Sequence, residues 1–330
     1  MSRHPASAMN GDSPASPAGE SQTSDPDAVA AQIASEELLR PGQPVLVLLS
    51  GGRDSVALLD IAVRIAGPEN VAALHVNYGL RGLDTDADQA HCEAICASLN
   101  VPLHVHRVER RGAGNLQAWA REARYAAAEA TAPAGADIAT GHTATDQVET
   151  ILLRLASSPS RRALLGMAPR RERLVRPLLL LTRDQTAAYG TARGLAWRED
   201  ATNDTPAYAR GRARANLVPA LRELHPAAEQ NVLALAETLR AEAAVLDELV
   251  EAALNGQPTI SLDAARALPP ALAALVLQRL ADTAAGRPAP GTAARAHEIL
   301  ALGPHAELHL PHGIRVQSRR GTLQFLNSPR

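Results

Sequence analysis

The chain has 330 residues, of which 46% are hydrophobic and only 2% aromatic. This length allows two domains, and this composition excludes a wholly disordered chain and calls for cores of Ala, Leu and Val. The formal net charge is −2 and the sequence contains no Lys, which excludes a lysine nucleophile, Schiff-base chemistry and the lysine of a Walker P-loop.

The first 36 residues are predicted to form a disordered tail, because their start is rich in Ser, Pro, Ala and acidic residues. No apolar segment is long enough for a signal peptide core or a membrane span, so we expect a cytoplasmic protein. Cys92 and Cys96 lie four residues apart on an expected helix and are interpreted as reduced core thiols. A metal site with His91 would lack a fourth ligand.

A buried strand is predicted over residues 44–49, followed by the small-residue turn 50–55 and a helix over 56–66. Further strands and helices alternate after it, with strands over 70–77, 103–108 and 136–141 and helices over 85–99, 116–131 and 145–155. This alternation is typical of an α/β fold with a doubly wound parallel sheet. Ligands bind at the carboxyl ends of such strands, where Ser50, Asn77 and Gly141-His142 are expected to converge.

The pattern changes after residue 225. Helices are expected over 229–254, 271–282 and 292–302, followed by alternating strands with two Gly-containing turns over 306–325. We therefore predict three regions: the tail 1–36, a catalytic domain 37–225 with a basic region, and a small, mainly helical domain 226–330 that ends in a β-hairpin or meander.

The turn Ser50-Gly-Gly-Arg-Asp-Ser55 is the strongest functional signal. Between a strand and a helix it would present backbone N–H groups and two serine hydroxyls to an anion at the positive end of the helix. A carboxylate beside phosphates, here Asp54, is useful mainly as a Mg²⁺ ligand. The alternative is a tight turn that binds nothing.

Charge is unevenly distributed along the chain. Residues 161–222 contain 13 Arg and 5 acidic residues, whereas residues 223–300 contain 5 Arg and 10 acidic residues. A basic segment of this kind favours a surface that binds a polyanion, and the alternative is a set of solvated Arg side chains.

The turn resembles the PP-loop, S-G-G-x-D-S, of enzymes that cleave ATP to AMP and pyrophosphate. Later segments make residues 45–221 similar to the tRNA(Ile)-lysidine synthetase family: His75-Val-Asn-Tyr-Gly-Leu-Arg81, Ala120-Arg-Glu-Ala-Arg-Tyr125, Gly141-His-Thr-Ala-Thr-Asp-Gln147, Arg176-Pro-Leu-Leu179 with Arg183, Trp197 to Asp204, and Tyr208 to Arg214.

The resemblance implies a PP-loop nucleotide-binding fold and two substrates besides ATP: a CAU-anticodon isoleucine tRNA and free L-lysine. ATP, with Mg²⁺, adenylates the wobble cytidine and lysine then displaces AMP, which forms lysidine. A homodimer is a further expectation, and no membrane partner is expected.

The implied roles fall into four groups. Catalysis is assigned to Asp54, Asp146 and His142. Nucleotide binding is assigned to Ser50, Gly51, Gly52, Arg53, Asp54, Ser55, Val76 and Gly141. tRNA binding is assigned to Arg81, Arg121, Arg124, Arg176, Arg210, Arg212 and Arg214. Mg²⁺ binding is assigned to Asp54.

Several of these residues also have plain structural interpretations. His142 could be a structural histidine, Glu149 a charge on the helix surface, and Tyr125 and Trp197 core residues rather than platforms for bases. Each basic-segment arginine could be an ordinary surface side chain.

The chain departs from the family pattern at two places. Thr145 stands where the family usually has the first Asp of H-x-x-D-D-Q, and Ser157-Ser-Pro-Ser160 replaces an R-G-x-G loop. Arg161 and Arg162 could supply the lost charge. The remaining alternatives are a thiolating PP-loop tRNA enzyme, which would need a catalytic cysteine pair or an iron–sulfur cluster, a small-molecule synthetase, and a non-catalytic RNA-binding protein.

Overall fold

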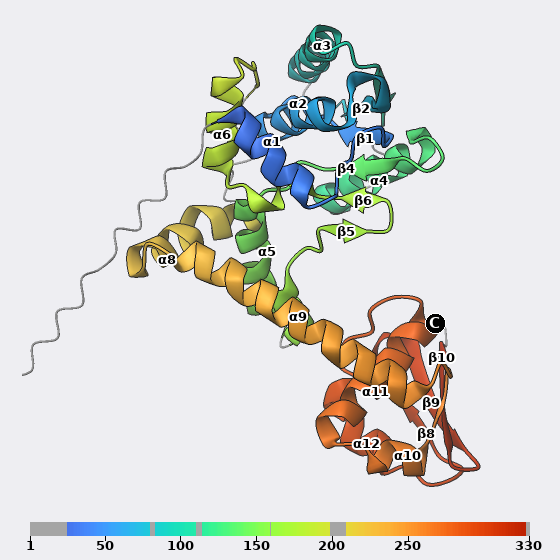
Figure 1. The fold of residues 1–330 in the computed structure, drawn as a ribbon. Helices are drawn as coiled ribbons and strands as arrows, with labels where there is room; N and C mark the ends of the chain where they lie inside the picture. Colours follow the sequence, from blue (N-terminus) through green and yellow to red (C-terminus); the bar gives the residue numbers. More distant parts are fainter. Residues whose placement is uncertain (1–24, 80–82, 110–113, 159, 199–208, 328–330) are drawn as a thin grey trace, which may run out of the picture. The chain divides into compact units, whose positions relative to one another are not determined.

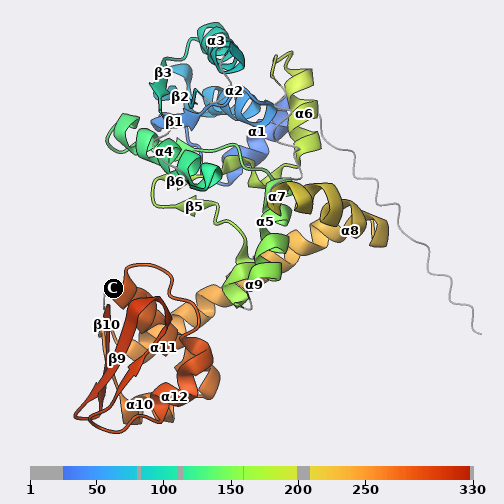
Figure 2. The same cartoon turned by 180° about the vertical axis from the view of Figure 1, so that it is seen from behind.

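The computed structural model describes residues 25–79, 83–109, 114–158, 160–198 and 209–327. The chain forms two compact units, the first from residues 1–143 and 169–199 and the second from residues 144–168 and 200–330. Their described parts are shown from two sides in Figures 1 and 2. Among the described residues, none of the helices combines the length and the hydropathy that a membrane span requires.

The first unit is built on a six-stranded sheet with the order β3-β2-β1-β4-β6-β5. All neighbouring strands are parallel except β5 and β6, which pair antiparallel. The strands are β1 (Val45–Leu48), β2 (Val71–Asn77), β3 (Leu103–Arg107), β4 (Asp137–Ala139), β5 (Arg170–Arg171) and β6 (Leu174–Val175). The order reverses at β1, so the crevice between the ends of β1 and β4 is the expected ligand site of a doubly wound sheet. The predicted α/β fold class is confirmed.

Alternating side chains of β1 fill two different cores, because successive strand residues point to opposite faces. Val45 and Val47 pack with helices of one face, whereas Leu46 and Leu48 pack with α4 on the other. The helices of the first unit are α1 (Pro26–Ser35), α2 (Arg53–Ala66), α3 (Leu83–Ser98), α4 (Leu116–Thr131) and α6 (Arg183–Ala192), with 3₁₀ turns η1 (Pro68–Asn70) and η3 (Pro177–Leu180).

The predicted disordered tail is wrong at its end, because residues 26–35 form helix α1. Asp25 caps this helix by accepting a hydrogen bond from the N–H of Asp27. Val29 and Ile33 are buried in the core of the first unit, at 3% and 0% exposure. The prediction failed because the segment was judged by its overall polar composition, which does not reveal the spacing of Val29 and Ile33 along a helix. Residues 1–24 lie outside the described part of the chain.

The second unit contains α5 (Ala144–Ser157) and the residues after it up to 168, together with residues 200–330. This grouping differs from the linear boundary predicted at residue 225, because α5 packs along α9. Its other elements are η2 (Arg161–Leu165), α7 (Ala209–Arg212), the π-helix η5 (Ala213–Leu217), α8 (Val218–Leu224), α9 (Ala228–Leu254), α10 (Leu262–Ala267), α11 (Pro270–Ala285), η6 (Ala293–Arg295) and α12 (Ala296–Leu300).

A four-stranded antiparallel sheet ends the chain, with the order β7-β10-β9-β8. The strands are β7 (Ile260–Ser261), β8 (Glu307–His309), β9 (Ile314–Arg319) and β10 (Thr322–Asn327), with η7 (Pro311–Gly313) before β9. Arg320 and Gly321 both have positive φ and join β9 to β10 as a two-residue hairpin turn. The predicted β-meander is thus present, and β7 adds a fourth strand to it.

Candidate functional site

The turn after β1 has the geometry of an anion-binding loop. Gly51 has a φ of +83°, and a Cβ there would lie 3.2 Å from the Sγ of Cys92. Gly52 is the N-cap of α2 and no side chain caps the helix, so the helix N-terminus offers its backbone N–H groups and its dipole to a ligand.

Serine hydroxyls hold this loop in shape. The Oγ of Ser55 donates to the carbonyl of Gly52 at 2.8 Å and accepts from the N–H of Ser50 at 3.2 Å. The Oγ of Ser50 lies 3.0 Å from that of Ser55 and accepts from the N–H of Gly52 at 3.3 Å. The two serines are therefore structural clamps of the loop, a role that the sequence pattern did not distinguish from direct phosphate binding.

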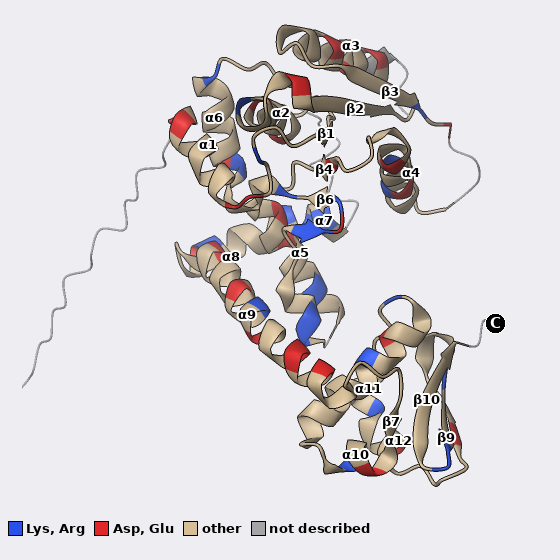
Figure 3. Cartoon of the chain, turned by 45° about the vertical axis from the view of Figure 1, so that its right-hand side comes forward, with Lys and Arg blue, Asp and Glu red and all other residues tan. Residues whose placement is uncertain are grey.

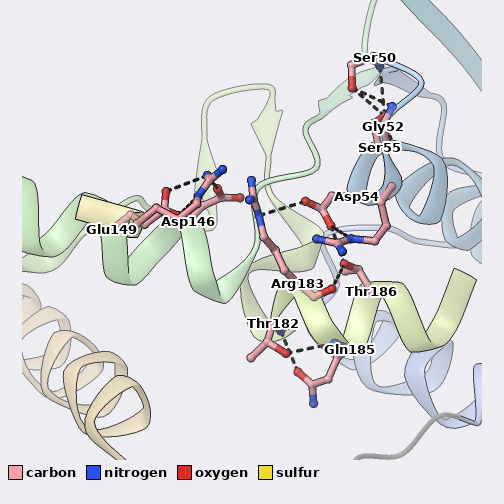
Figure 4. A network of polar contacts seen from close by, with 12 residues as sticks. Ser50, Gly52, Asp54, Ser55, Asp146, Glu149, Thr182, Arg183, Gln185 and Thr186 are labelled. Carbon is pink, nitrogen blue, oxygen red and sulfur yellow. Dashed lines mark hydrogen bonds and ion pairs between the residues drawn. The ribbon is translucent and has the colours of Figure 1, made fainter. Parts of the chain in front are cut away.

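Asp54 lies in the first turn of α2, and both of its carboxylate oxygens have partners (Figure 4). Its Oδ1 lies 2.5 Å from the hydroxyl of Thr186 and 3.3 Å from the Nε of Arg53. Its Oδ2 lies 3.5 Å from the Nε of Arg183. The side chain is 16% exposed, so it can still be reached by a ligand.

Gly141 closes the crevice from the side of β4. A Cβ at this position would lie 3.1 Å from the backbone of Asp54 and 3.2 Å from the N of Ser55, tighter than side chains usually pack. The glycine thus allows β4 to approach the start of α2. Val76, by contrast, is 9% exposed and packs in the core against α4, which leaves only its backbone for a nucleotide.

His142 follows Gly141 and is half-buried. Its Nδ1 lies 2.8 Å from the Oγ1 of Thr140, at the carboxyl end of β4. This contact fixes the ring and is compatible with both the structural and the catalytic interpretation.

The two cysteines are free and buried. Burial raises the pKa of Cys92 to about 12 and that of Cys96 to about 11. Both are therefore neutral thiols near pH 7, as predicted for core residues, and poor nucleophiles. His75, whose pKa burial lowers, lies beside them, with its Nδ1 3.3 Å from the Sγ of Cys92.

A cluster of two carboxylates and two guanidinium groups lies in the second unit, on α5, α7 and η5. Asp146 and Glu149 are 5% and 0% exposed and one helical turn apart. Arg210 donates to the Oε2 of Glu149 and to the Oδ1 of Asp146, both at 2.9 Å. Arg214 donates to the Oε1 of Glu149 at 2.6 Å.

This cluster overturns one interpretation and qualifies another. Glu149 is not a surface charge; it is the centre of a buried ion-pair cluster. Arg210 and Arg214 have carboxylate partners, although Arg210 keeps 39% of its side chain exposed. Their predicted contact with tRNA stays a prediction.

Gln147 organises the loop that follows η2. Its side chain donates to the carbonyl of Met167 at 2.8 Å and accepts from the N–H of Met167 at 2.6 Å. Gly166 has a φ of +64°, and a Cβ there would lie 2.6 Å from the Oε1 of Gln147. The close packing of these residues explains why a glutamine and a glycine stand at these positions.

Three serines of the divergent segment, Ser157, Ser158 and Ser160, line a hollow of about 400 Å³ at the end of α5. Arg161 lies 3.9 Å from Glu242, and Arg162 donates to Asp282 at 2.6 Å. The two arginines that could have replaced the charge of the family's loop therefore face α9 and α11. Thr145, the other position where the chain departs from the family pattern, is buried, with 9% of its surface exposed.

The remaining arginines assigned to tRNA lie in contrasting environments. Arg121 and Arg124 are exposed on α4, where Arg121 stacks 4.9 Å from the ring centroid of Tyr125 and Arg124 donates to the hydroxyl of Tyr78 at 3.2 Å. Arg176 is only 5% exposed, and burial lowers its pKa, so it is not the surface arginine that the charge pattern suggested. Arg212 is exposed, and Arg81 lies outside the described residues.

Many arginines of the basic stretch pair with acidic residues, and Figure 3 shows that basic and acidic positions are interspersed along the elements of the chain. Within the described part of the chain, at least ten of its arginines lie within 4.0 Å of a carboxylate: Arg161, Arg162, Arg170, Arg173, Arg183, Arg193, Arg198, Arg210, Arg214 and Arg222. The sequence count therefore overestimates the surface charge. Tyr125 and Trp197 both pack against cores, as predicted.

Comparison with known proteins defines the class first. A family model described as a PP-loop domain matches residues 26–221, which is the segment that holds the loop, the sheet and α5. PP-loop domains use ATP, so this domain is assigned to ATP use. The fold is similar to that of a U34-tRNA thiolase from Methanococcus maripaludis, a protein with a [4Fe-4S] cluster. The TM-score is 0.52 and the sequence identity 16%, and the match covers 64% of this chain and 78% of that chain. This likeness concerns the fold alone.

Curated relatives define the family more narrowly. A tRNA(Ile)-lysidine synthase from Salinispora tropica is 38% identical over 88% of this chain and 92% of its own length. One from Thermus thermophilus is 39% identical over 89% of this chain. The chain therefore belongs to the tRNA(Ile)-lysidine synthase family, as the sequence motifs predicted. It covers 59% of the length of the Thermus relative.

One residue of the site was missed by sequence reasoning. Thr186 holds Asp54, and it lies so far along the chain from its partner that no local pattern connects the two. Arg183 and Arg198 were part of recognised motifs, but their contacts were not foreseen: Arg183 lies 3.5 Å from Asp54, and the backbone N–H of Arg198 donates to the carbonyl of Gly51 at 3.0 Å.

Proposed function

We propose that this protein uses ATP to join L-lysine to carbon 2 of the wobble cytidine in a CAU-anticodon isoleucine tRNA. The observation that carries the proposal is the intact PP-loop with its held Asp54, in a chain that aligns over 92% of the Salinispora synthase.

The chemistry has two steps. The cytosine O2 attacks the α-phosphorus of ATP, an O2–P bond forms and the bond to pyrophosphate breaks. The ε-amine of lysine then forms a bond to carbon 2, the C2–O2 bond breaks, and O2 leaves with AMP. Adenylation is needed because an amide-like oxygen is otherwise a poor leaving group.

The loop residues are proposed to bind and orient the triphosphate. The uncapped N-terminus of α2 provides N–H donors and a favourable dipole for the departing pyrophosphate. Ser50 and Ser55 keep these donors in place through their mutual hydrogen bonds. Positioning of this kind, rather than covalent catalysis, is the main contribution of a protein to phosphate chemistry.

Mg²⁺ is proposed to bind at Asp54. The donor chemistry fits, because Mg²⁺ is commonly held by one or two carboxylates together with substrate phosphates, and Asp54 is a partly exposed carboxylate at the phosphate loop. When bound, the ion would neutralise the charge on the phosphates.

Asp146 and His142 are proposed as the further catalytic groups. A carboxylate such as Asp146 can contact the metal or accept a proton from the lysine ammonium, and its ion pair with Arg210 fixes its position. His142 can donate to a phosphate or to the target base from the carboxyl end of β4. A homodimer is proposed as the assembly.

Thiolation is disfavoured by the cysteines. The sequence contains only Cys92 and Cys96, on a single helix, and both are buried neutral thiols. A sulfur-transfer enzyme requires thiolates that can reach substrate or a cluster.

The test is incorporation of radiolabelled lysine into a transcribed CAU-anticodon isoleucine tRNA with Mg-ATP. Wild type is compared with Asp54→Asn, which keeps the shape of the side chain and removes its charge. We expect label to enter the RNA with wild type only, and none to enter methionine tRNA with the same anticodon.

Other outcomes would replace the proposal. Pyrophosphate release with another acceptor but no lysine incorporation would indicate a different PP-loop synthetase. Binding of tRNA without any turnover would indicate a non-catalytic RNA-binding protein.

A further inference from the structure

The carboxylate of the phosphate loop is held from helix α6, which lies far along the chain from the loop. Thr186 and Arg183 contact different oxygens of Asp54, and Thr186 is 132 residues away in sequence. Figure 4 shows both side chains pointing from α6 to Asp54. From one helix, a hydroxyl thus hydrogen-bonds one oxygen of the carboxylate and a guanidinium lies within ion-pair distance of the other.

Thr186 is the more restrictive of the two contacts. It is fully buried, at 0% exposure, and its Oγ1 lies 2.5 Å from the Oδ1 of Asp54 and 2.9 Å from the carbonyl of Arg183. A hydroxyl carries one proton, and an ionised carboxylate is the stronger acceptor. The proton is therefore directed mainly at Asp54, and the ordinary helix-interior bond of a threonine to its own helix is secondary.

Helix α6 is itself firmly attached to α2, the helix that carries Asp54. Asp60, further along α2, is 1% exposed and accepts from Arg193 at 2.9 and 3.0 Å and from the hydroxyl of Tyr189. Thr182 and Gln185 form a capping box at the start of α6. The Thr186 hydroxyl therefore has little freedom to move relative to Asp54.

We propose that Thr186 is a positioning residue, which orients the Asp54 carboxylate so that the lone pair left open by Thr186, Arg53 and Arg183 faces the metal–nucleotide complex. An aspartate side chain rotates about two χ angles, and a metal demands a defined oxygen position. The hydrogen bond from Thr186 on α6 holds the Asp54 oxygens in one such position. This inference rests on the proposed function, because it assumes that Asp54 receives Mg²⁺ with ATP.

The experiment measures how strongly the metal and the nucleotide depend on each other. Calorimetry gives the Kd of α,β-methylene-ATP, which cannot be cleaved at the reacting bond, once with Mg²⁺ and once with EDTA. The ratio of the Kd in EDTA to the Kd with Mg²⁺ reports the contribution of the metal alone. A loss of general loop structure would weaken both binding reactions together and leave the ratio unchanged.

We expect Thr186→Val to lower this ratio about 10-fold, the effect of losing a hydrogen bond to a charged group, with the Kd in EDTA within about 2-fold of wild type. Thr186→Ser keeps the hydroxyl and should restore the ratio. Thr182→Val removes the helix cap instead; it should lower the Tm and leave the ratio unchanged. If Thr186→Val does not fold, the pair Thr186→Ser and Thr186→Ala provides the same hydroxyl comparison.

The results separate this inference from the proposed function. An unchanged ratio in Thr186→Val, or equal losses with Mg²⁺ and EDTA, would overturn the positioning role even if wild type incorporates lysine. A ratio near one in wild type that Asp54→Asn does not alter would show that the metal is not held at Asp54, and would overturn the inference whatever the labelling experiment gives. Failure of lysine labelling with an intact, Thr186-dependent ratio would overturn only the assigned reaction.

Discussion

The stability of the first unit should fall steeply at alkaline pH because of its two thiols. Burial raises the pKa of Cys92 from 9.0 to about 12 and that of Cys96 from 9.0 to about 11. Between pH 9 and the raised pKa of each folded thiol, the unfolded chain loses thiol protons that the folded chain retains. The contribution of the two thiols to the free energy of unfolding is therefore fully present below pH 9 and is lost as the pH rises. Burial also raises the pKa of Tyr189 from 10.0, which extends the loss above that pH.

The magnitude follows from the linkage relation. Each pH unit above 9.0 removes about 1.4 kcal/mol per thiol until the folded pKa is reached. At about pH 10 the two thiols together should have cost about 3 kcal/mol, a large part of the stability of a typical domain. The absence of Lys from the sequence makes this window easier to interpret, since no lysine ammonium titrates in it.

The assay is urea unfolding at about pH 8 and pH 10 under reducing conditions, followed by fluorescence of Trp119 and Trp197, which both lie in the first unit. The reference is the double variant Cys92→Ala, Cys96→Ala. Its lost packing lowers stability equally at both pH values, so only the difference between them is compared. If the double variant loses as much stability as wild type between the two pH values, the thiols are not the cause and the reasoning fails.

Three further predictions concern the site. Glu149→Gln should lower the free energy of unfolding of the second unit by about 3 kcal/mol, because its two arginine partners lose a buried counter-charge. Circular dichroism during urea unfolding measures this free energy. The control Glu242→Gln, at an exposed position, should change the free energy by less than about 0.5 kcal/mol. Gly141→Ala should weaken α,β-methylene-ATP binding in calorimetry by about 10-fold or more, since a Cβ would displace the start of α2, whereas Gly114→Ala, with open space around it, should not. Arg124→Gln should reduce the salt dependence of tRNA binding by about one unit of slope, and an unchanged slope would remove Arg124 from the tRNA surface.

Local patterns predicted the elements of the α/β sheet well. Helix 116–131 was predicted with the bounds that α4 has, and the strands and helices around residues 44–66 and 70–108 were found within a few residues. These segments carry strong apolar periodicity and clear breaks, which are local properties. The meander after residue 306 was predictable for the same reason, since Gly321 marks a tight hairpin.

Segments defined by distant contacts were not predictable in this way. Helix α1 has a local start signal in Asp25, but it is held in place by Val29 and Ile33, which fill the core of the first unit, and short strand β6 pairs with β4. The same limit applied to the site. The loop could be recognised from its glycines and serines, but the partner of Asp54 could not, because Thr186 is an ordinary helix residue until the fold brings it to the loop.

The arginines show how a lysine-free chain divides one residue type between two tasks. Arg170 clasps Asp137 through two hydrogen bonds at 2.7 and 2.9 Å, and Arg193 clasps Asp60 in the same bidentate way. These geometries use the planar fork of the guanidinium, which an ammonium cannot reproduce. By contrast, Arg212 of the basic segment lies exposed, as do Arg121 and Arg124 on α4 beside tyrosine side chains. Charge counted along the sequence merges these two groups, whereas only the second can contribute strongly to binding a polyanion. The number of arginines that contact tRNA should therefore be well below the number in the basic segment.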